Sequence, residues 1–520
     1  MSASGNDITM IPKISDYMAG SSVLVTGVTG FVGLALVEKL IRCVPDLANI
    51  YVLIRPKRGK SKEERYQEIM SNKLFETIKQ SDHSSSLRKV VPIEGSIDEN
   101  ELGLCEQDLQ TVISSVNYVF HCAATLDFEA SLKTTMEINV LGTRQVVDMC
   151  KRMRNLKCLV QVSSAYANAN LLHTEEILYP PPDNVEKIIE MVQTLSNTEL
   201  EEITPKVLKK HPNTYTFTKA LAEHEVAKEF SNFPSCIVRP SMIVGTWKDP
   251  VPGWTNSKNG PTGFFQGAAT GVVRRLPVAK HLVYDYIPVD IVINAMISGA
   301  VYTASQWESL DKTPIFHVTS STYKPFRWAM VEDKMSVLLQ KYPLKQAVWY
   351  PYLKLVPSLN LYYISAFIFH LIPAYFFDTL AKFTGQRPKL VRLHTAIGQS
   401  LDRLAPFIFT EWMFENTNLL RLHKALHTAD NQLFTLDIGP LDWEAFFEDM
   451  AKGVRRYLCK EEDSTLPSAR KKAQWLKLFN FLLQVVLFYL LLITVRSFGN
   501  LSYSSAFAIM PIFGAIYFYL

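Results

Sequence analysis

The sequence predicts an α/β protein with a doubly wound parallel sheet, a mainly helical C-terminal region, and a transmembrane segment or hairpin at the C-terminal end. Three observations lead to this fold class. Short β-rich runs alternate with helical patterns over about the first 240 residues. A glycine-rich turn follows the first of these runs, and two long uncharged stretches end the chain. Strands alternating with helices are typical of parallel sheets covered by helices on both faces.

Six runs have the composition of strands, and several of them are continuously apolar, as expected for strands buried on both faces of a parallel sheet. They are residues 23–26, 50–54, 90–94, 118–121, 158–163 and 236–239. Helical patterns lie between them at residues 34–42, 136–154 and 215–230. This order predicts a Rossmann-type domain, in which ligands bind at the carboxyl ends of the strands where the strand order reverses.

The glycine-rich turn reads VLVTGVTGFVG at residues 23–33. Alone, this pattern could be a tight turn between a strand and a helix. Its position at the end of the first strand and the start of the first helix favours a phosphate-binding turn. We expect Gly27 to permit the turn, Gly30 to let the backbone approach a pyrophosphate, and Gly33 to allow close packing of helix on strand.

Basic residues follow the second strand, which ends YVLIRPKRGK. A cofactor with a free ribose 2′-hydroxyl is usually bound by an acidic residue here, whereas Arg55, Lys57 and Arg58 suit a 2′-phosphate. The pattern therefore favours NADPH over NADH, with an exposed basic loop as the alternative. We assign the cofactor contact to Arg55 and leave Lys57 and Arg58 open.

The segment NTYTFTKALAEH at residues 213–224 predicts the site of chemistry. Tyr215 and Lys219 are four residues apart and share one face of a helix. A phenol has an ordinary pKa of about 10, and a neighbouring ammonium together with an oxidised nicotinamide ring would stabilise its phenolate. Upstream, QVSSAYAN places Ser163 and Ser164 at the end of the fifth strand, where a hydroxyl can hydrogen-bond a substrate carbonyl oxygen.

Several longer motifs accompany these residues, and through them the chain resembles the extended short-chain dehydrogenase/reductases, most closely the alcohol-forming fatty acyl-CoA reductases. The motifs are TGVTGFVG, VFHCAAT (119–125), VSSAYAN (162–168), ITPK (203–206), NTYTFTKALAE (213–223), IVRPSMIVGTWKDPVPGW (237–254) and NGPTG (259–263). Beyond residue 340 the chain is similar to the C-terminal male-sterility-type domain of that family, including LDWEAFFEDMAKGVRRYL at residues 441–458.

The resemblance implies reduction of a fatty acyl-CoA to a primary alcohol through an aldehyde, with two NADPH consumed and coenzyme A released, in wax or ether-lipid metabolism. It implies that Tyr215 is the general acid, Lys219 its partner, Ser164 the carbonyl-binding hydroxyl, and Asn139 an orienting residue in EINVLGT. Many relatives have an acidic residue beside the adenine where this chain has Gly95, Ser96 and Ile97, so the adenine contact stays open. The expected cofactor contacts are Thr26, Gly27, Thr29, Gly30, Phe31, Val32, Gly33, Arg55, Ala123, Ala124, Tyr215 and Lys219.

The expected domain organisation has four parts. They are an N-terminal leader (1–19), an NADP-binding reductase domain (20–335), a fatty acyl-CoA reductase C-terminal domain (340–462) and a membrane anchor (476–520). Two other functions remain open at this stage: another membrane-bound reductase of the same fold acting on a sterol, another lipid or a sugar-nucleotide, and a catalytically silent NADP-binding membrane scaffold. The intact Ser164, Tyr215 and Lys219 disfavour the scaffold.

Composition restricts the partners. The chain has 54 Lys and Arg against 50 Asp and Glu, which gives no sign of a nucleic-acid-binding surface. Its seven cysteines are scattered without a CxxC pair, which indicates reduced thiols in a cytosol-facing protein and no zinc site; no other cluster has metal-ligand spacing. The opening MSASGNDITMIPK is unlike a secretory signal. A homo-oligomer is compatible with the sequence.

The two uncharged C-terminal stretches cover residues 478–495 and 501–520. A helix needs about 17 to 25 such residues to cross a bilayer. Arg470, Lys471, Lys472 and Lys477 precede the first stretch and only Arg496 follows it, so the positive-inside rule places the catalytic part in the cytosol. We expect the endoplasmic reticulum as the location, with the peroxisome as the alternative; a buried hairpin of a soluble domain is the competing interpretation.

Three weaker patterns complete the expectations. Residues 355–377 are uncharged, but Pro357 and Pro373 favour a core or interfacial helix over a third membrane crossing. Arg274 and Arg275 could meet coenzyme A phosphates, yet a solvated loop is favoured. For His121 and Cys122 a buried structural role is favoured over catalysis.

Overall fold

The computed structural model describes residues 10–57, 59–385 and 387–519, with side chains described as far as residue 514. Its contacts divide the chain into two compact units. The first, here called the sheet unit, comprises Met1–Trp254, Val283–Phe326 and Trp412–Leu441. The second, the helical unit, comprises Thr255–Leu282, Arg327–Glu411 and Asp442–Leu520. Each unit combines segments that are far apart in the sequence, and the domain limits expected from the sequence stay a prediction.

The sheet unit is built on a seven-stranded parallel sheet with the order β11-β7-β5-β4-β1-β2-β3. The six predicted strands are confirmed, with ends shifted by at most two residues, and β11 is an additional edge strand. The strands are β1 (Ser22–Thr26), β2 (Ile50–Ile54), β3 (Val90–Glu94), β4 (Val116–His121), β5 (Cys158–Val162), β7 (Ser235–Pro240) and β11 (Ile315–Val318). The predicted α/β fold class is therefore confirmed.

The strand order reverses between β1 and β4, which lie side by side with Thr26 opposite His121. β2 and β3 extend the sheet from one side of β1, while β5, β7 and β11 extend it from the side of β4. The carboxyl ends of β1 and β4 therefore form the switch point at which doubly wound sheets bind ligands.

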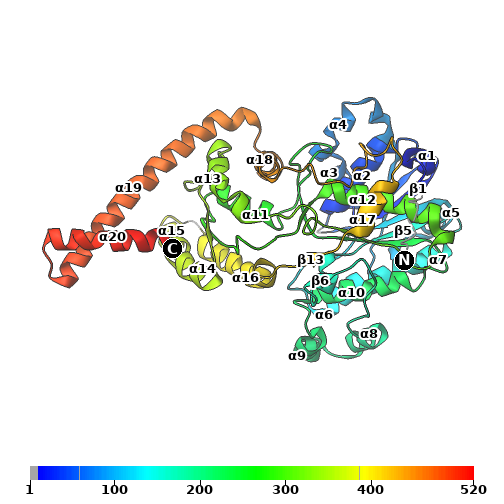
Figure 1. Ribbon diagram of the computed structural model, residues 1–520, viewed down its shortest axis with the longest axis horizontal. Coiled ribbons are helices and arrows are strands. Elements are labelled where there is room, and N and C mark those ends of the chain that lie inside the picture. The colour runs from blue at the N-terminus through cyan, green and yellow to red at the C-terminus, as the bar shows by residue number, and fades with distance from the viewer. Residues whose placement is uncertain (1–9, 58, 386, 520) are drawn as a thin grey trace, which may run out of the picture. The chain divides into compact units, whose positions relative to one another are not determined.

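Helices cover both faces of this sheet (Figure 1). α2 (Phe31–Cys43) and α12 (Val289–Gln306) pack together on one face. On the other face, α5 (Glu106–Ser115), α7 (Gly142–Arg152) and α10 (Thr214–Ala227) share a buried core with the strands. The helix predicted at 136–154 begins as a π-helix, Met136–Leu141, which continues directly into α7 and ends at Arg152.

Short elements complete the sheet unit. Two-residue β6 (His173–Thr174) pairs with β13 (Met413–Phe414), and β8 (Met242–Val244) pairs with β10 (Tyr286–Pro288). The remaining helices of this unit are α1 (Ile14–Met18), α3 (Lys62–Met70), α4 (Glu76–Lys79), α6 (Leu132–Thr135), α8 (Val185–Thr194), α9 (Asn197–Leu208) and α17 (Thr417–Ala425).

Part of the expected N-terminal leader belongs to this unit. Ile14 and Met18 of α1 are buried, and the backbone N–H of Ile14 donates to Asp430 Oδ2 at 2.8 Å. Residues 1–9 lie outside the described part of the chain.

The helical unit contains one small parallel pair, β9 (Arg275–Pro277) with β12 (Lys354–Val356), and otherwise helices. A π-helix, Phe367–Leu371, joins α14 to α15 without a break. The helices are α11 (Pro261–Ala269), α13 (Glu332–Lys341), α14 (Leu359–Ala366), α15 (Ile372–Phe383), α16 (Leu390–Ile408), α18 (Trp443–Gly453), α19 (Leu466–Gly499) and α20 (Tyr503–Tyr519).

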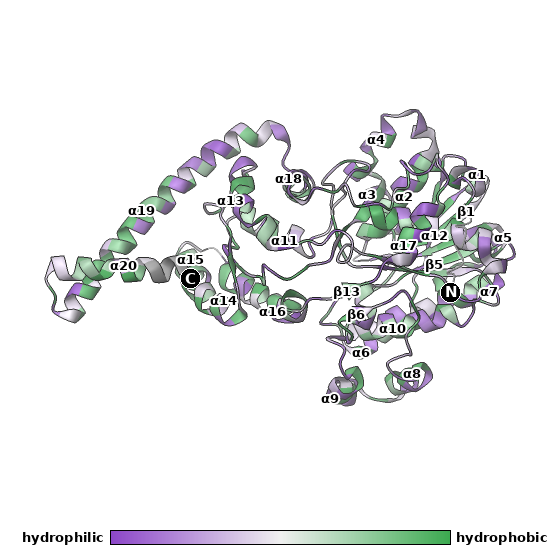
Figure 2. Ribbon diagram, viewed as in Figure 1, coloured by the Kyte–Doolittle hydropathy of each residue, from purple (hydrophilic) through white to green (hydrophobic). Residues whose placement is uncertain are grey.

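Among the residues that the structure describes, two segments of the helical unit are long and apolar enough to cross a membrane, by length and composition alone. They are Asp463–Gly499, with a mean hydropathy of 2.4 and none of its apolar window buried, and Leu359–Phe383, with a mean hydropathy of 1.5 and a third of its window buried. Figure 2 shows the polar start of α19 giving way to hydrophobic residues along the helix. α20 packs back on α19, where the rings of Phe488 and Phe507 lie 6.4 Å apart.

Candidate functional site

The glycine turn between β1 and α2 is built so that two of its glycines have no room for a side chain. Gly27 has a φ of +74°, and a Cβ there would lie 2.7 Å from the backbone nitrogen of Ala123. A Cβ on Gly33 would lie 2.5 Å from the carbonyl oxygen of Gly27. Gly27 therefore permits the turn against the end of β4, and Gly33 permits the close approach of α2.

Two residues of the turn are exposed just before α2. Thr29 and Gly30 are exposed, and Gly30, the N-cap of α2, provides no side chain to accept a hydrogen bond from the first turn. Helix N-termini with unsatisfied N–H groups attract phosphate. A pyrophosphate therefore fits this turn on the observed geometry. Phe31 and Val32 are half-buried, and Phe31 stacks on Trp254 with 5.3 Å between ring centroids.

A buried chain of hydrogen bonds leads from this turn to the helix that carries Asn139. Thr26 Oγ1 lies 2.9 Å from His121 Nδ1, and His121 Nε2 lies 3.1 Å from Thr143 Oγ1. The Thr143 hydroxyl donates to the carbonyl of Asn139 at 2.6 Å, so it must accept from His121, whose Nε2 carries the proton. Burial lowers the pKa of His121 to about 3, and the charge of Lys219 lowers it further. His121 is thus neutral and has the buried structural role expected from the sequence.

Tyr215 and Lys219 lie on one face of α10, and both are buried. Asn213 caps the helix by accepting from the Thr216 N–H at 2.9 Å, which fixes the start of α10. Lys219 Nζ donates to the carbonyl of Val162 at 2.8 Å, at the end of β5 and two residues before Ser164. The structure therefore brings Ser164, Tyr215 and Lys219 together at the carboxyl edge of the sheet.

The electrostatics of this trio are set mainly by burial. Burial raises the pKa of Tyr215 to about 12, and a hydrogen bond with Ser164 opposes that rise. Burial lowers the pKa of Lys219 to about 8, against the charge of Glu223, which raises it. At neutral pH, Tyr215 therefore carries a proton to donate, and Lys219 is charged.

Asn139 reaches α10 through a threonine. Its Oδ1 accepts from the backbone N–H of Thr125 at 2.9 Å, and its Nδ2 donates to Thr218 Oγ1 at 3.1 Å. No direct hydrogen bond from Asn139 to Lys219 is present among the described residues; the contact is to the neighbour of that lysine. Its position in a π-helical turn is typical of functional sites.

A second buried group lies behind Lys219 and was not predicted. Arg239 on β7 donates to Glu223 on α10 from Nε at 2.8 Å and from Nη2 at 2.7 Å, and both side chains are almost completely buried. Ser163 Oγ donates to the same carboxylate at 2.5 Å, and Arg239 also lies 3.0 Å from His317 Nε2. Glu223 is one helical turn beyond Lys219, and that spacing is the signal in the sequence that could have identified it.

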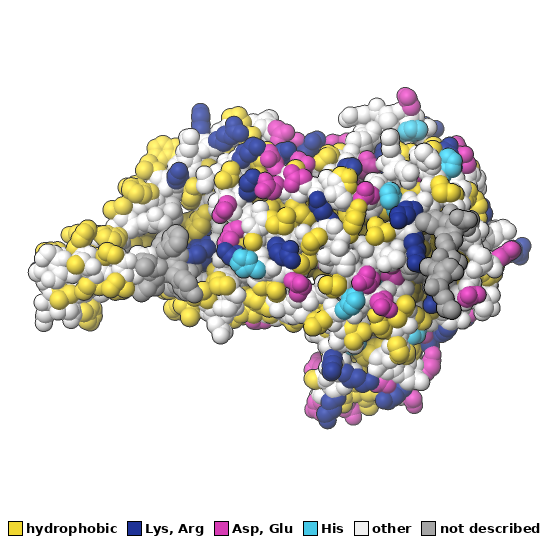
Figure 3. Space-filling view, viewed as in Figure 1, with side chains coloured by type: hydrophobic (Ala, Val, Ile, Leu, Met, Phe, Trp, Pro, Cys, Tyr) yellow, Lys and Arg dark blue, Asp and Glu magenta, His cyan; other side chains and the backbone are white. Residues whose placement is uncertain are grey.

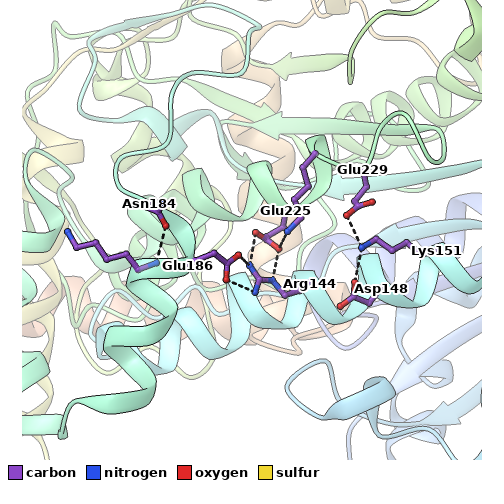
Figure 4. A network of polar contacts seen from close by, with 9 residues as sticks. Arg144, Asp148, Lys151, Asn184, Glu186, Glu225 and Glu229 are labelled. Atoms are coloured by element: carbon purple, nitrogen blue, oxygen red, sulfur yellow. Dashed lines mark hydrogen bonds and ion pairs between the residues drawn. The ribbon is translucent and has the colours of Figure 1, made fainter.

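The outer surface of α10 is tied to its neighbours by ion pairs (Figure 4). Arg144 of α7 donates to Glu225 of α10 at 2.7 Å and to Glu186 of α8 at 2.5 Å, and Lys151 of α7 pairs with Glu229 at 2.7 Å. Burial alone would raise the pKa of Glu225, but Arg144 and Lys228 hold it below its ordinary value. These contacts fix the position of the helix that carries Tyr215 and Lys219.

At the far edge of the expected cofactor site, Arg55 is about half exposed at the end of β2. It forms an ion pair of 3.5 Å with Asp98, which also accepts a hydrogen bond from Ser96. Asp98 was not predicted; it comes one residue after the Gly95-Ser96-Ile97 stretch in which an acidic residue was sought. Lys57 is exposed, and Arg58 lies outside the described residues. Ala123 and Ala124 are half-buried directly after β4.

The solvated loop expected for Arg274 and Arg275 is wrong. Both side chains are buried, and Arg275 belongs to strand β9 of the helical unit. The backbone N–H of Arg274 donates to His370 Nε2 at 3.0 Å, and the Arg275 guanidinium lies 4.2 Å from the Phe369 ring centroid. Arginine side chains readily pack against aromatic rings. The sequence around Arg275 did not reveal this packing, because the ring of Phe369 comes from a distant part of the chain.

Comparison with known proteins covers nearly the whole chain. Two family models, both described as "Male sterility protein", match residues 25–296 and 369–461. A Drosophila melanogaster protein that carries a fatty acyl-CoA reductase name is 49% identical over 96% of this chain and 98% of its own length. "Fatty acyl-CoA reductase 1" of Xenopus laevis is 36% identical over 88% of each chain, and "Fatty acyl-CoA reductase 2" of Mus musculus is 34% identical over 91% of this chain and 92% of its own.

Among solved structures, the terminal R domain from the myxalamid PKS-NRPS biosynthetic pathway is similar with a TM-score of 0.55 at 18% identity. The similarity covers 87% of this chain and 95% of that domain and supports the fold.

Proposed function

This chain belongs to the fatty acyl-CoA reductase family of NAD(P)-dependent oxidoreductases, and on that premise we propose that it reduces long-chain fatty acyl-CoA to a primary alcohol with NADPH. Coenzyme A is released at the first of two reduction steps, and an aldehyde links them. The alcohol serves lipid synthesis of the wax or ether-lipid type. The observation that carries the proposal is the trio of Ser164, Tyr215 and Lys219 at the carboxyl end of β5, the strand next to the switch point of the sheet.

The residues of the sheet unit fit a nicotinamide dinucleotide. The turn at Gly27, Gly30 and Gly33 and the N-terminus of α2 would hold the pyrophosphate. Arg55, half exposed after β2, would bind a 2′-phosphate, which favours NADPH over NADH. Asp98 would hold the Arg55 side chain in position through their ion pair. It is also our candidate for the acidic residue that many relatives have beside the adenine. When bound, one NADPH would supply a hydride to the thioester carbonyl carbon, and a second NADPH, replacing the spent cofactor, would supply a hydride to the aldehyde carbon.

In the first reduction, Ser164 and Tyr215 hydrogen-bond the thioester oxygen as it becomes negative. Such donors stabilise a developing oxyanion in a buried site. Tyr215 then gives its proton to that oxygen, and the resulting hemithioacetal loses the thiol of coenzyme A as its C–S bond breaks and its hydroxyl becomes the aldehyde carbonyl. Tyr215 regains a proton from solvent before the second reduction. The same two hydroxyls then hold the aldehyde oxygen, and Tyr215 donates the proton that makes the alcohol.

Lys219 supports both proton transfers. Its positive charge stabilises the tyrosinate that remains after each donation, which lowers the cost of releasing the proton. The hydrogen bond from Lys219 Nζ to the Val162 carbonyl holds the ammonium in place. Asn139 positions the same helix through Thr218.

We also propose that the protein is anchored by α19, with α20 folded back on it, so that the catalytic part faces the cytosol. The basic residues before the uncharged run of α19 support this orientation. The endoplasmic reticulum is the first expectation for the membrane and the peroxisome the second.

Replacing Tyr215 with Phe tests the proposal. Removal of the proton donor is expected to lower alcohol formation from labelled acyl-CoA and NADPH by about 10²–10⁴-fold. NADPH binding, measured by fluorescence titration, is expected to persist because the phenol oxygen is not needed for the pyrophosphate contacts. Tyr302→Phe on α12 is the matched control and should retain activity. Undiminished alcohol formation by Tyr215→Phe, or no alcohol from the native chain with any acyl length, would overturn the assignment.

A further inference from the structure

The helical unit presents an unusual surface along α14, the π-helix Phe367–Leu371 and α15. Apolar side chains recur every three to five residues on one face, and all of them are exposed; Phe376 is 65% exposed and Phe383 85%. We call this face the apolar stripe; its members include Ile364, Phe367, Ile372, Phe376, Leu380 and Phe383. Helices of water-soluble proteins place such a stripe against the core instead.

The opposite face of the same helices is buried and carries three polar residues. Ser365, His370 and Asp378 point inward, and each has partners in the helical unit. His370 accepts from the Arg274 backbone N–H at 3.0 Å. Asp378 accepts from the three backbone N–H groups that open α16, at 2.9 to 3.0 Å. These bonds fix the rotation of the helices, so the apolar side is held outward by the fold.

This segment does not cross a bilayer, because the chain before it and the chain after it are packed together. The backbone N–H groups of Lys345 and Gln346 donate to the carboxylate of Glu461 at 2.8 and 2.9 Å. Lys341 and Glu448 form an ion pair of 2.6 Å. A single crossing between residues 359 and 383 would place these partners on opposite sides of a membrane. Exposure excludes the core alternative as well, so the interfacial alternative raised by the sequence is the one that fits.

A tryptophan connects α15 to the proposed anchor. The ring of Trp349 lies 6.1 Å from Phe377 of α15 and 5.6 Å from Phe479 of α19, and its Nε1 donates to Asn480 Oδ1 at 3.1 Å. The uncharged run of α19 starts at Leu478, directly after Lys477. α15 therefore lies beside α19 where that helix would enter the hydrocarbon, the depth at which tryptophan is enriched in membrane proteins.

Exposed basic residues lie close to the apolar stripe in the sequence. Lys382, Arg387, Lys389 and Arg392 are exposed around the end of α15 and the start of α16. The only acidic residue between 359 and 401 is Asp378, which is engaged by the N-terminus of α16. Basic residues beside a membrane-inserted apolar face attract anionic lipid headgroups, each contributing about 1 kcal/mol near the surface. In Figure 3, hydrophobic side chains also cover the neighbouring α19 and α20.

We propose that the apolar stripe and these four basic residues form a second membrane contact, which lies in the interface of an anionic phospholipid bilayer and holds the helical unit flat on it. This contact rests on the proposed anchoring by α19, and it adds a surface that α19 alone does not provide. The occupant is the lipid bilayer, since the apolar stripe continues at the level where the anchor enters the membrane and the charge beside it matches anionic headgroups.

Photocrosslinking in the full chain tests the proposal. The photoreactive residue p-benzoylphenylalanine replaces Phe376 in the apolar stripe, Phe481 on α19, or Val337, an exposed position on α13 that serves as the control. Each protein is reconstituted in phosphatidylcholine vesicles containing phosphatidylserine, irradiated and examined for lipid adducts by mass spectrometry. Adducts at positions 376 and 481, and none at 337, are the expected result.

The other outcomes separate the two ideas. Adducts at position 481 without any at 376 would overturn the second contact and leave the anchor intact. No adduct at 481 would overturn the anchor, whatever position 376 shows. An adduct at 337 as strong as at 376 would show unspecific contact and overturn the second contact.

A charge variant tests the basic part separately. Replacing Lys382, Arg387, Lys389 and Arg392 with Gln in the full chain is expected to lower the adduct yield at position 376 several-fold in the anionic vesicles. The yield at position 481 should not change and serves as the internal control. An unchanged yield at 376 would overturn the role of the basic residues.

Discussion

Three side chains follow one another along a single face of α10: Tyr215, Lys219 and Glu223, each one turn beyond the last. The face runs from the proton donor, through the cation that supports it, to a carboxylate bound by Arg239. Because all three are buried, their charges act on one another with little screening by water. The charge state of Lys219 therefore depends in part on Glu223, a residue that does not touch the substrate.

The first prediction at this scale concerns pH. The pKa of Lys219 is lowered by burial to about 8, so the ammonium is present below that pH and is lost above it. Without the charge, Tyr215 is a weaker proton donor, and kcat/KM for the acyl-CoA is expected to fall as the pH rises through about 8. The measurement is the kcat/KM profile from pH 6 to 10; a flat profile over this range would contradict the role of Lys219.

Glu223→Gln is expected to move that alkaline limb to lower pH. The Glu223 charge raises the pKa of Lys219, so its removal lets the lysine lose its proton earlier. The variant also leaves the buried Arg239 without its countercharge, which typically costs roughly 3–5 kcal/mol of stability, so the profile is taken at a temperature where circular dichroism shows a folded chain. Glu201→Gln at an exposed position on α9 is the control; an alkaline limb that stays in place in Glu223→Gln would contradict the coupling.

Sequence reasoning identified the residues that lie in short motifs and missed those joined only by the fold. Tyr215 and Lys219 are one turn apart in a helix, and Ser164 ends a recognisable strand, so local spacing was sufficient. Glu223 and Arg239 are on different elements, and their bond exists because β7 lies beside β5 under α10. The spacing from Lys219 pointed to Glu223, but nothing local pointed to its partner Arg239. In the same way, nothing local showed that Arg275 packs on the ring of Phe369.

At the scale of elements, the turn from β1 to α2 is held by contacts with the end of β4. A side chain at Gly27 would meet the backbone of Cys122 and Ala123 at less than 3 Å, and backbone cannot move aside as a flexible side chain can. The turn, the strand end and the first turn of α2 are therefore one rigid part of the expected cofactor site.

Gly27→Ala is expected to lower both stability and NADPH affinity. The positive φ alone costs roughly 1–2 kcal/mol for a residue with a Cβ, and the clash with Ala123 adds to it. Gly20→Ala is the matched control, since Gly20 also has a positive φ, +69°, but open space around its Cβ position. Thermal unfolding and NADPH titration of both variants check this; equal losses in the two would show that the contact with β4 does not matter.

Secondary-structure elements could be predicted where their amino-acid composition alone favours a strand or a helix. The six predicted strands are short apolar or β-branched runs bounded by turns, and all of them except the edge strand β3 are central in the sheet. β11 lies at the edge of the sheet, and its sequence, IFHV, is similar in composition to the other strands. It pairs only with β7, about 75 residues earlier in the chain, so nothing local identified it. The π-helical turn around Asn139 was also invisible, because its side-chain pattern differs little from that of an α-helix.

At the scale of the whole molecule, two kinds of membrane attachment are expected to be separable. Removing residues 466–520 deletes α19 and α20 but leaves the apolar stripe and its basic neighbours. The shortened chain is expected to bind anionic vesicles at low ionic strength and to leave them at about 1 M salt, where surface charges are screened over about 3 Å. The full chain should stay bound under both conditions. Vesicle flotation measures this, and a shortened chain that never floats would contradict the prediction.

The way the two units share the chain has a practical consequence for making fragments and hybrids. A cut near residue 340, suggested by similarity to the C-terminal domain, would take β13 and α17 away from the sheet unit. The carboxylate of Glu176 accepts hydrogen bonds from the backbone N–H groups of Asn418 and Leu419. In such a fragment it would lose both donors. If such a fragment were inactive, the cause would be damage to the sheet unit itself. Exchanges between relatives should therefore swap all three segments of the helical unit together.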